Sequence, residues 1–448
     1  MSLKHPGFGI LRPWILAVGL LAAVGCGSAA VDSGPLSNSN GPAGAQAPDS
    51  QAFAQEGTTA APGESPVLEE PAARPISTPI PAPAIGPDGV AIPGVVPMVD
   101  ISIHQVSLDD IVFDTFSGFG RYVPLSIADD DLILRLRDAI VPIAQPVYGG
   151  PDALSWLEDE DLVLGYRSGE AAFAYPVNVL NFHELVTDDI GGVPVLITYC
   201  PLCFSGVVFN REVDGRVLTF GNTSALYQSD LVMYDHQTGS YWFQVGGEAV
   251  VGTLTGTRLK ILPSATMEWG QWRRLYPDTK LLVGTIQDTD GFNQSRYGRG
   301  MSAGFQDSVN REDFAFPVSK DKLDPRLSAG EIVVTIELNQ AAKAYPLGLL
   351  GNAAVNDTLG GQPVVLLTRE DNRGVGAFSP LLDAMALTFE FRDSDDAFVD
   401  RETVSIWDVG GRATSGPMEG VQLDLLNTRR AFWFSIAIAF PGIELFLP

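Results

Sequence analysis

The second half of the chain repeats the residue pattern of the first, and this duplication constrains the fold more than any other feature. The aligned segments, in chain order, are 160–180 with 330–350, 186–203 with 355–372, 216–221 with 385–390 and, more loosely, 269–282 with 433–446. The dipeptide Tyr175-Pro176 falls on Tyr345-Pro346. Two copies are too few for a solenoid, so we predict two related, pseudo-symmetric halves in one compact body.

Apolar periodicity predicts an α+β fold that is mainly β. Expected strand regions are a pair around 167–170, a single strand over 193–200, a hairpin over 206–222 with Asp214-Gly215 at its turn, and a pair over 247–262. Expected helices cover 129–140, 150–159, 178–186 and 266–276. Strands therefore outnumber helices in the predicted unit.

The first 26 residues have the pattern of an export signal. The apolar run 14–25 is too short to span a bilayer and ends in small residues before Cys26. This arrangement resembles a bacterial lipobox, whose Cys is diacylated after cleavage; the alternative is an ordinary signal peptide with a chance Cys. We expect a protein exported to the bacterial cell envelope, facing the periplasm or the exterior, whose membrane partner is reached through the lipid on Cys26.

The remaining chain divides by composition. Residues 27–97 are rich in Pro, Gly, Ser and Ala and lack a periodic apolar pattern, which predicts a disordered tether. The predicted first repeat covers 98–290 and the second covers 291–448. A net charge of −26 argues against a nucleic-acid partner, because such partners require basic surfaces.

Differences between the copies indicate where a functional site lies, because residues that only maintain the fold should be present in both copies. Cys200 and Cys203 form a Cys-Pro-Leu-Cys motif in the first copy, and with Cys26 they are the three cysteines of the chain. His183-Glu184 is also confined to the first copy. The segment containing Asp235 and His236 aligns only loosely, 233–244 with 405–416. The first copy is therefore expected to carry a site and the second to be degenerate.

Three hypotheses fit these residues, and the sequence leaves open whether the protein is an enzyme. In a metal site, Cys200, Cys203, His183 and His236 bind zinc or copper, which accept sulfur and imidazole ligands. In a thiol site, Cys200 is the nucleophile, His183 is oriented by Glu184 or Asp235, and Cys203 resolves a disulfide. In the third, the protein is a non-catalytic binding or scaffolding lipoprotein and the two cysteines are structural.

Several motifs resemble a known family. They are the segments YPVNVLNFHELV, YCPLC, MYDHQTGSYWFQ and the closing W…YPDTKLL. Together they resemble the domain-of-unknown-function family 3179 (DUF3179) over about residues 130–350. The resemblance implies a domain and a residue pattern but no established activity, substrate or partner. His236 stands where the family pattern has Arg, which argues against a metal role for this position throughout the family.

Overall fold

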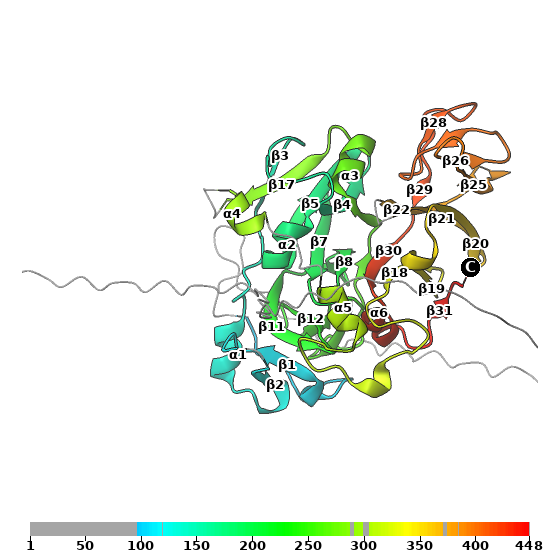
Figure 1. Ribbon diagram of the computed structural model, residues 1–448. Coiled ribbons are helices and arrows are strands. Elements are labelled where there is room, and N and C mark those ends of the chain that lie inside the picture. Colours follow the sequence, from blue (N-terminus) through cyan, green and yellow to red (C-terminus); the bar gives the residue numbers. More distant parts are fainter. Residues whose placement is uncertain are drawn as a thin grey trace, which may run out of the picture. The chain divides into compact units, whose positions relative to one another are not determined.

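The computed structural model describes residues 96–118, 120–286, 291–298, 304–370, 374–383 and 385–447 (Figure 1). All of them belong to the unit Ile80–Pro448. The predicted signal peptide, Cys26 and all but the last two residues of the predicted tether lie outside these residues. Within the described ranges, no helix combines the length and apolarity needed to cross a membrane.

The protein is mainly β, as the periodicity predicts. A five-stranded sheet has the order β16 (Ser264–Glu268), β4 (Leu162–Ser168), β5 (Ala171–Pro176), β17 (Lys280–Thr285) and β3 (Pro146–Gly149). A six-stranded sheet has the order β14 (Glu248–Val251), β13 (Tyr241–Phe243), β12 (Asp230–Asp235), β11 (Phe220–Tyr227), β1 (Ile111–Asp114) and β2 (Tyr122–Pro124).

The largest sheet, of eight strands, combines both predicted repeats. Its order is β31 (Glu444–Leu445), β19 (Ala341–Pro346), β18 (Ile332–Leu338), β30 (Thr428–Phe432), β8 (Ser205–Asn210), β7 (Val193–Cys200) and β6 (Leu185–Ile190), with β15 (Lys260–Ile261) also paired to β8. In Figure 1 the red strand β30 lies beside the green strand β8 and the yellow strand β18. One continuous hydrogen-bonded layer therefore contains strands from residues 185–210 and from residues 332–445.

Smaller sheets complete the C-terminal part. One contains β20 (Ala353–Leu359), β21 (Gln362–Arg369), β22 (Gly374–Ser379) and β29 (Asp424–Leu425). Another contains β25 (Phe389–Arg392), β26 (Ala397–Asp400), β27 (Ile406–Trp407) and β28 (Ala413–Ser415). Two-stranded pairs are β9 (Glu212–Val213) with β10 (Arg216–Val217), and β23 (Leu381–Leu382) with β24 (Met385–Ala386).

The helices of the described residues are short. They are α1 (Asp130–Leu136), α2 (Val177–His183), α3 (Trp269–Leu275), α4 (Gln294–Tyr297), α5 (Phe305–Asn310) and α6 (Trp433–Ala439). Single 3-10 turns cover Leu108–Asp110, Leu125–Ile127, Lys320–Lys322 and Leu347–Leu349. The helix predicted over 150–159 is wrong, because this segment forms turns between β3 and β4.

The two predicted hairpins differ in outcome: one forms around its Asp-Gly turn, and in the other the two strands pair elsewhere. Asp214 and Gly215 have φ values of 49° and 75° and join β9 to β10, as a two-residue Asp-Gly turn requires. In the 247–262 region both predicted strands exist, as β14 and β15, but they do not pair with each other. β14 pairs with β13, and β15 pairs with β8. Periodicity correctly identified these strands but not their partners.

The cysteines lie in a core between two sheets. Phe209 on β8, Met233 on β12, Trp242 on β13 and Phe432 on β30 belong to the same buried apolar cluster as Cys200 and Cys203. This cluster joins the eight-stranded sheet to the six-stranded sheet. Any site at the cysteines is therefore enclosed by both sheets.

Candidate functional site

The two cysteines lie at the turn that joins β7 to β8, Cys200 directly before it and Cys203 within it. Cys200 ends β7 and is paired with Ser205, the first residue of β8. Phe204 adopts a φ of 55°, in the left-handed region, and the chain reverses direction at this point. Cys200 is 1% exposed and Cys203 is 0% exposed. The turn therefore brings both thiols into the core, where they are free rather than joined in a disulfide.

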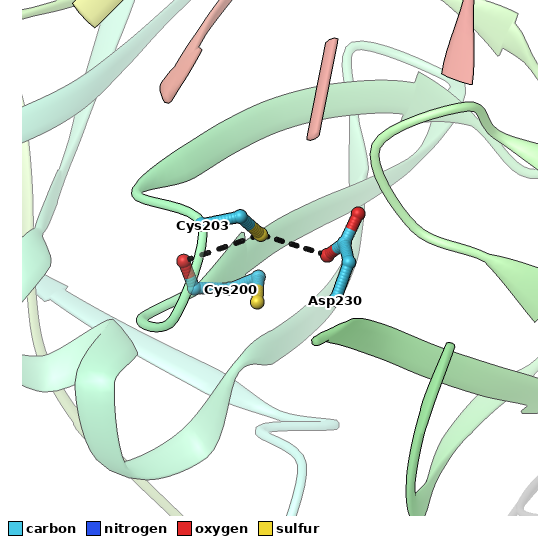
Figure 2. A group of neighbouring side chains, drawn as sticks. All are labelled: Cys200, Cys203 and Asp230. Atoms are coloured by element: carbon cyan, nitrogen blue, oxygen red, sulfur yellow. Dashed lines mark hydrogen bonds between the residues drawn. The ribbon is translucent and has the colours of Figure 1, made fainter. Parts of the chain in front are cut away.

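A third residue, Asp230, completes a cluster that we call the Cys–Asp cluster: Cys200, Cys203 and Asp230. Gln228 and Ser229, with φ values of 52° and 62°, form the tight turn between β11 and β12. Asp230 follows this turn as the first residue of β12 and is fully buried. Cys203 Sγ donates to Asp230 Oδ1 at 2.9 Å. One ligand atom from each residue of the cluster lies within 4.8 Å of the others (Figure 2).

Polar partners hold the carboxylate and the second thiol in place. The backbone N–H groups of Leu231 and Val245 donate to the two carboxylate oxygens of Asp230, at 2.7 and 3.2 Å. Ser205 Oγ lies 3.2 Å from Cys203 Sγ. Ser205 in turn donates to Gln244 Oε1 at 2.6 Å. The cluster is thus embedded in a buried hydrogen-bond network that fixes its geometry.

Burial shapes the protonation of the cluster. Loss of hydration raises the pKa of Cys200 to about 11 and that of Cys203 well above its usual range. It also raises the pKa of Asp230 to about 6, opposed by hydrogen bonds from both thiols. At neutral pH the two thiols hold their protons and Asp230 is mostly ionised. The S–H of Cys203 accordingly donates to the carboxylate.

His183 does not join the cluster. It ends α2, and its Nδ1 donates to the carbonyl of Val141 at 2.8 Å. Its Nε2 lies 2.9 Å from the hydroxyl of Tyr297. Both ring nitrogens therefore have partners away from the sulfurs. Among the residues with described positions, the cluster of potential metal ligands contains no histidine.

Glu184, the residue after His183, does influence the cluster. Its φ of 57° ends α2, and its carboxylate accepts a hydrogen bond from Asn222 Nδ2. Burial, with a smaller contribution from the negative charge of Asp230, raises the pKa of Glu184 to about 8. The charge of Glu184 likewise raises the pKa of Cys200. Of the predicted His–Glu pair, only the carboxylate thus acts on the thiols.

Asp235 and His236 lie at the opposite end of β12 from Asp230. Asp235 accepts hydrogen bonds from Thr238 Oγ1 at 2.8 Å and from Trp242 Nε1 at 3.0 Å. The ring of His236 stacks on Tyr234 with centroids 5.1 Å apart, and neither ring nitrogen has a hydrogen-bond partner within the described ranges. The structure therefore places neither residue in the Cys–Asp cluster.

Asp400 shows that the bonds of Asp235 are structural. Asp400 accepts from Thr403 Oγ1 at 2.8 Å and from Trp407 Nε1 at 2.9 Å. These contacts match those of Asp235 in donor type and in spacing along the chain. The hydrogen-bond pattern of segment 233–244 therefore recurs around Asp400, which precedes the loosely aligned segment 405–416. Because the same bonds occur at Asp400, they do not distinguish Asp235 as a site residue.

Asp230, Ser205 and Gln244 are not among the site residues that the sequence predicts. Asp230 precedes the apolar run Leu231–Tyr234, and a carboxylate at the start of a buried strand needs a specific partner. The sequence thus indicates that Asp230 has a specific partner. It does not indicate that this partner is Cys203, because the two residues are 27 positions apart and meet only through the packing of two sheets.

Comparison with known proteins agrees with the motif resemblance. The family model described as "Protein of unknown function (DUF3179)" matches residues 137–442, which is more than half of the chain. The chain belongs to the DUF3179 family. The DUF3179 match includes the whole Cys–Asp cluster and extends through β30 and α6, beyond the region where the motifs are strongest. No curated protein and no solved structure matches the chain.

Proposed function

We propose that the protein binds one zinc or copper ion at the Cys–Asp cluster. The observation that carries this proposal is the convergence of two sulfurs and one carboxylate oxygen within 4.8 Å of one another. Ligand atoms bound to one tetrahedral zinc ion at about 2.0–2.3 Å lie roughly 3.5 Å apart, so this spacing suits a shared ion. Thiolate ligands favour zinc and copper over magnesium or calcium.

The charge of the cluster supports the same proposal. Beyond the effect of burial, negative charges act on the thiols: that of Asp230 raises the pKa of both, and that of Glu184 raises the pKa of Cys200. Three negative charges in a buried site without a cation would be energetically unfavourable. The pKa values of both thiols are raised for this reason, because protonation removes two of the charges. A bound ion would replace the thiol protons and compensate the carboxylate. Metal uptake is accordingly expected to release protons.

A structural cysteine pair is the second candidate, and the near-complete burial of both thiols favours it. The same burial argues against a thiol enzyme. Reactive cysteines are partly exposed and have a lowered pKa, whereas burial raises the pKa of both Cys200 and Cys203. We therefore rank metal binding first, a structural pair second and thiol catalysis third.

Elemental analysis of the purified full-length protein tests the proposal, with thiol titration on the same sample. We expect about one zinc or copper ion per chain. Cys200→Ser, Cys203→Ser and Asp230→Asn should each lower metal affinity by at least about tenfold, since each removes a ligand. Cys26→Ser, which removes the third cysteine, is the matched control and should retain the metal.

Other outcomes decide between the alternatives. A protein that takes up neither ion, and whose two thiols titrate only after denaturation, would favour the structural pair. A metal-free protein whose disulfide forms and opens at mild potential would favour thiol chemistry instead.

We also propose that the protein is exported and anchored by a lipid on Cys26. The support is the apolar run 14–25, followed by small residues directly before Cys26. Radiolabelled palmitate should be incorporated by the wild-type chain in a bacterial host and not by Cys26→Ser. Equal labelling of both chains would contradict the proposal.

We further infer that the two halves arose from one duplicated unit. Two pairing patterns support this inference. β4 pairs with β5 and β16 in antiparallel fashion, and β5 pairs with β17 in parallel. β18 pairs with β19 and β30 in antiparallel fashion, and β19 pairs with β31 in parallel. The bonds of Asp235 and Asp400 match as well. In this scheme the register position of Cys200 is occupied by Arg369 in the second half.

A further inference from the structure

Arg430, on β30, carries a buried positive charge without a partner of opposite charge. Its side chain is 4% exposed, and its Nε has no hydrogen-bond partner. Within the described residues the guanidinium forms no ion pair; it lies 4.7 Å from the ring of Phe204 and also interacts electrostatically with Tyr199. The preceding residue, Arg429, does form an ion pair, with Glu337. A buried charge without compensation is unfavourable, so Arg430 calls for an explanation.

A small cavity lies against Arg430. It has a volume of about 10 Å³ and is also lined by Gly206, Ser264 and Thr266. These residues come from β8, β16 and β30. Since Gly206 has no side chain, this part of the wall is backbone. A cavity of this size accommodates roughly one water-sized species.

Three of the side chains that line the cavity, Arg430, Ser264 and Thr266, can donate hydrogen bonds. Ser264 and Thr266 are 1% and 6% exposed, and neither hydroxyl forms a hydrogen bond in the described part of the chain. Thr428 is different, because its hydroxyl already donates to the carbonyl of Ser264 at 2.8 Å. The rest of the wall is mainly apolar, with Val334 and Val375. A guanidinium and two hydroxyls that can donate are the groups that solvate an anion.

We propose that this cavity binds one small inorganic anion of halide size, held by the guanidinium of Arg430 and the hydroxyls of Ser264 and Thr266. The space is about that of one small species, which suits a halide better than a larger oxyanion such as phosphate. Burial lowers the pKa of Arg430 to about 10, so the guanidinium remains charged at neutral pH. The anion would compensate this charge at a point where strands from residues 205–268 meet strands from residues 332–432. This site does not depend on the metal proposal.

Thermal unfolding of the purified full-length protein tests the inference. The unfolding midpoint is measured in sodium chloride and in sodium gluconate at equal ionic strength, because gluconate is too large for the cavity. At chloride concentrations about tenfold above the dissociation constant, we expect the midpoint to be about 2–4 °C higher in chloride. Bromide should replace chloride, and crystals grown in bromide should give an anomalous peak beside Arg430.

Variants separate specific binding from a general effect of salt. Arg430→Met should abolish the difference between chloride and gluconate. Arg326→Met is the matched control and should retain it, because Arg326 pairs with Asp324 at the surface. Thr266→Val keeps the charge but removes one donor, and it should raise the chloride concentration of half-maximal effect by about tenfold.

Two results would overturn the inference. One is an equal midpoint in chloride and gluconate for the wild-type protein. The other is a chloride effect that persists unchanged in Arg430→Met or, where that variant does not fold, in Thr266→Val.

Discussion

His183 and Glu184 are consecutive residues at the end of α2, yet they contact different parts of the molecule. His183 bonds to Val141 and Tyr297, whereas Glu184 bonds to Asn222 and acts electrostatically on Cys200. The positive φ of Glu184 redirects the chain between these two environments. At the scale of single residues, adjacency in sequence is thus a poor guide to a shared site.

The raised pKa of Glu184 predicts a specific pH dependence of stability. A carboxyl group whose pKa is about 8 in the folded protein binds more protons there than in the unfolded chain, where its pKa is near 4.3. The free energy of unfolding should therefore fall as pH rises from about 5 to 8. Glu184→Gln keeps an acceptor for Asn222 and removes the charge. It should be more stable than wild type at pH 9, by up to about 5 kcal/mol for a shift of this size, and equal to it at pH 4.

Urea denaturation across this pH range, in buffers with a chelator, measures the effect. Glu212→Gln changes an exposed carboxyl group and should leave the pH profile as in wild type. Identical profiles for Glu184→Gln and wild type would show that Glu184 does not contribute.

Part of the candidate site is predictable from the sequence at this scale. The sequence predicts a site at Cys200 and Cys203 because the aligned segment 355–372 lacks cysteine, and the structure brings both residues together with Asp230. His183 was selected by the same logic, but its bonds lead to Val141 and Tyr297. Absence from one copy indicates that a residue is specialised. It does not indicate which residues converge, since convergence depends on how the sheets pack.

At the scale of elements, two strand-turn-strand segments share one hydrogen-bond pattern. In β12–β13 the side chain of Thr238 donates to Asp235, and Ser240 Oγ accepts from the N–H of Leu254. In β26–β27 Thr403 donates to Asp400, and Ser405 Oγ accepts from the N–H of Met418. Glycines Gly252 and Gly416 each pass against these serines, where a Cβ would lie within 3 Å. The pattern therefore fixes the turn and the strand that follows it.

The shared pattern predicts equal sensitivity to mutation in the two elements. Thr238→Val and Thr403→Val each remove a hydrogen bond to a buried carboxylate, and each should lower the free energy of unfolding by about 1–3 kcal/mol. Urea denaturation measures both values. The control Thr358→Val changes an exposed side chain and should have little effect. A large loss in one element alone would show that the two turns are not equivalent.

The elements themselves were more predictable than their partners. Alternating apolar residues located β4, β5 and β7, and the Asp-Gly turn located β9 and β10, because these signals are local. The sequence did not predict that β30 would pair with β8. That pair joins Arg430 to Gly206, and nothing in either segment specifies so distant a partner.

At the scale of the whole molecule, the eight-stranded sheet makes the two predicted repeats depend on each other. Arg430 pairs with Gly206, and the N–H of Phe432 donates to the carbonyl of Cys203 at 2.9 Å. Thr428 Oγ1 donates to the carbonyl of Ser264 at 2.8 Å. The turn that holds the cysteines is thus supported by a strand from the other end of the chain.

Separate expression of the two predicted repeats, residues 98–290 and 291–448, tests this dependence. We expect neither fragment alone to give near-ultraviolet circular dichroism, because each exposes a sheet edge and the apolar core that its partner covers. Mixing them should restore the signal. A mixture in which the second fragment ends at residue 427 should not, because it lacks β30. Cooperative unfolding of fragment 98–290 on its own would mean that β30 adds only an edge strand to a unit that is already complete.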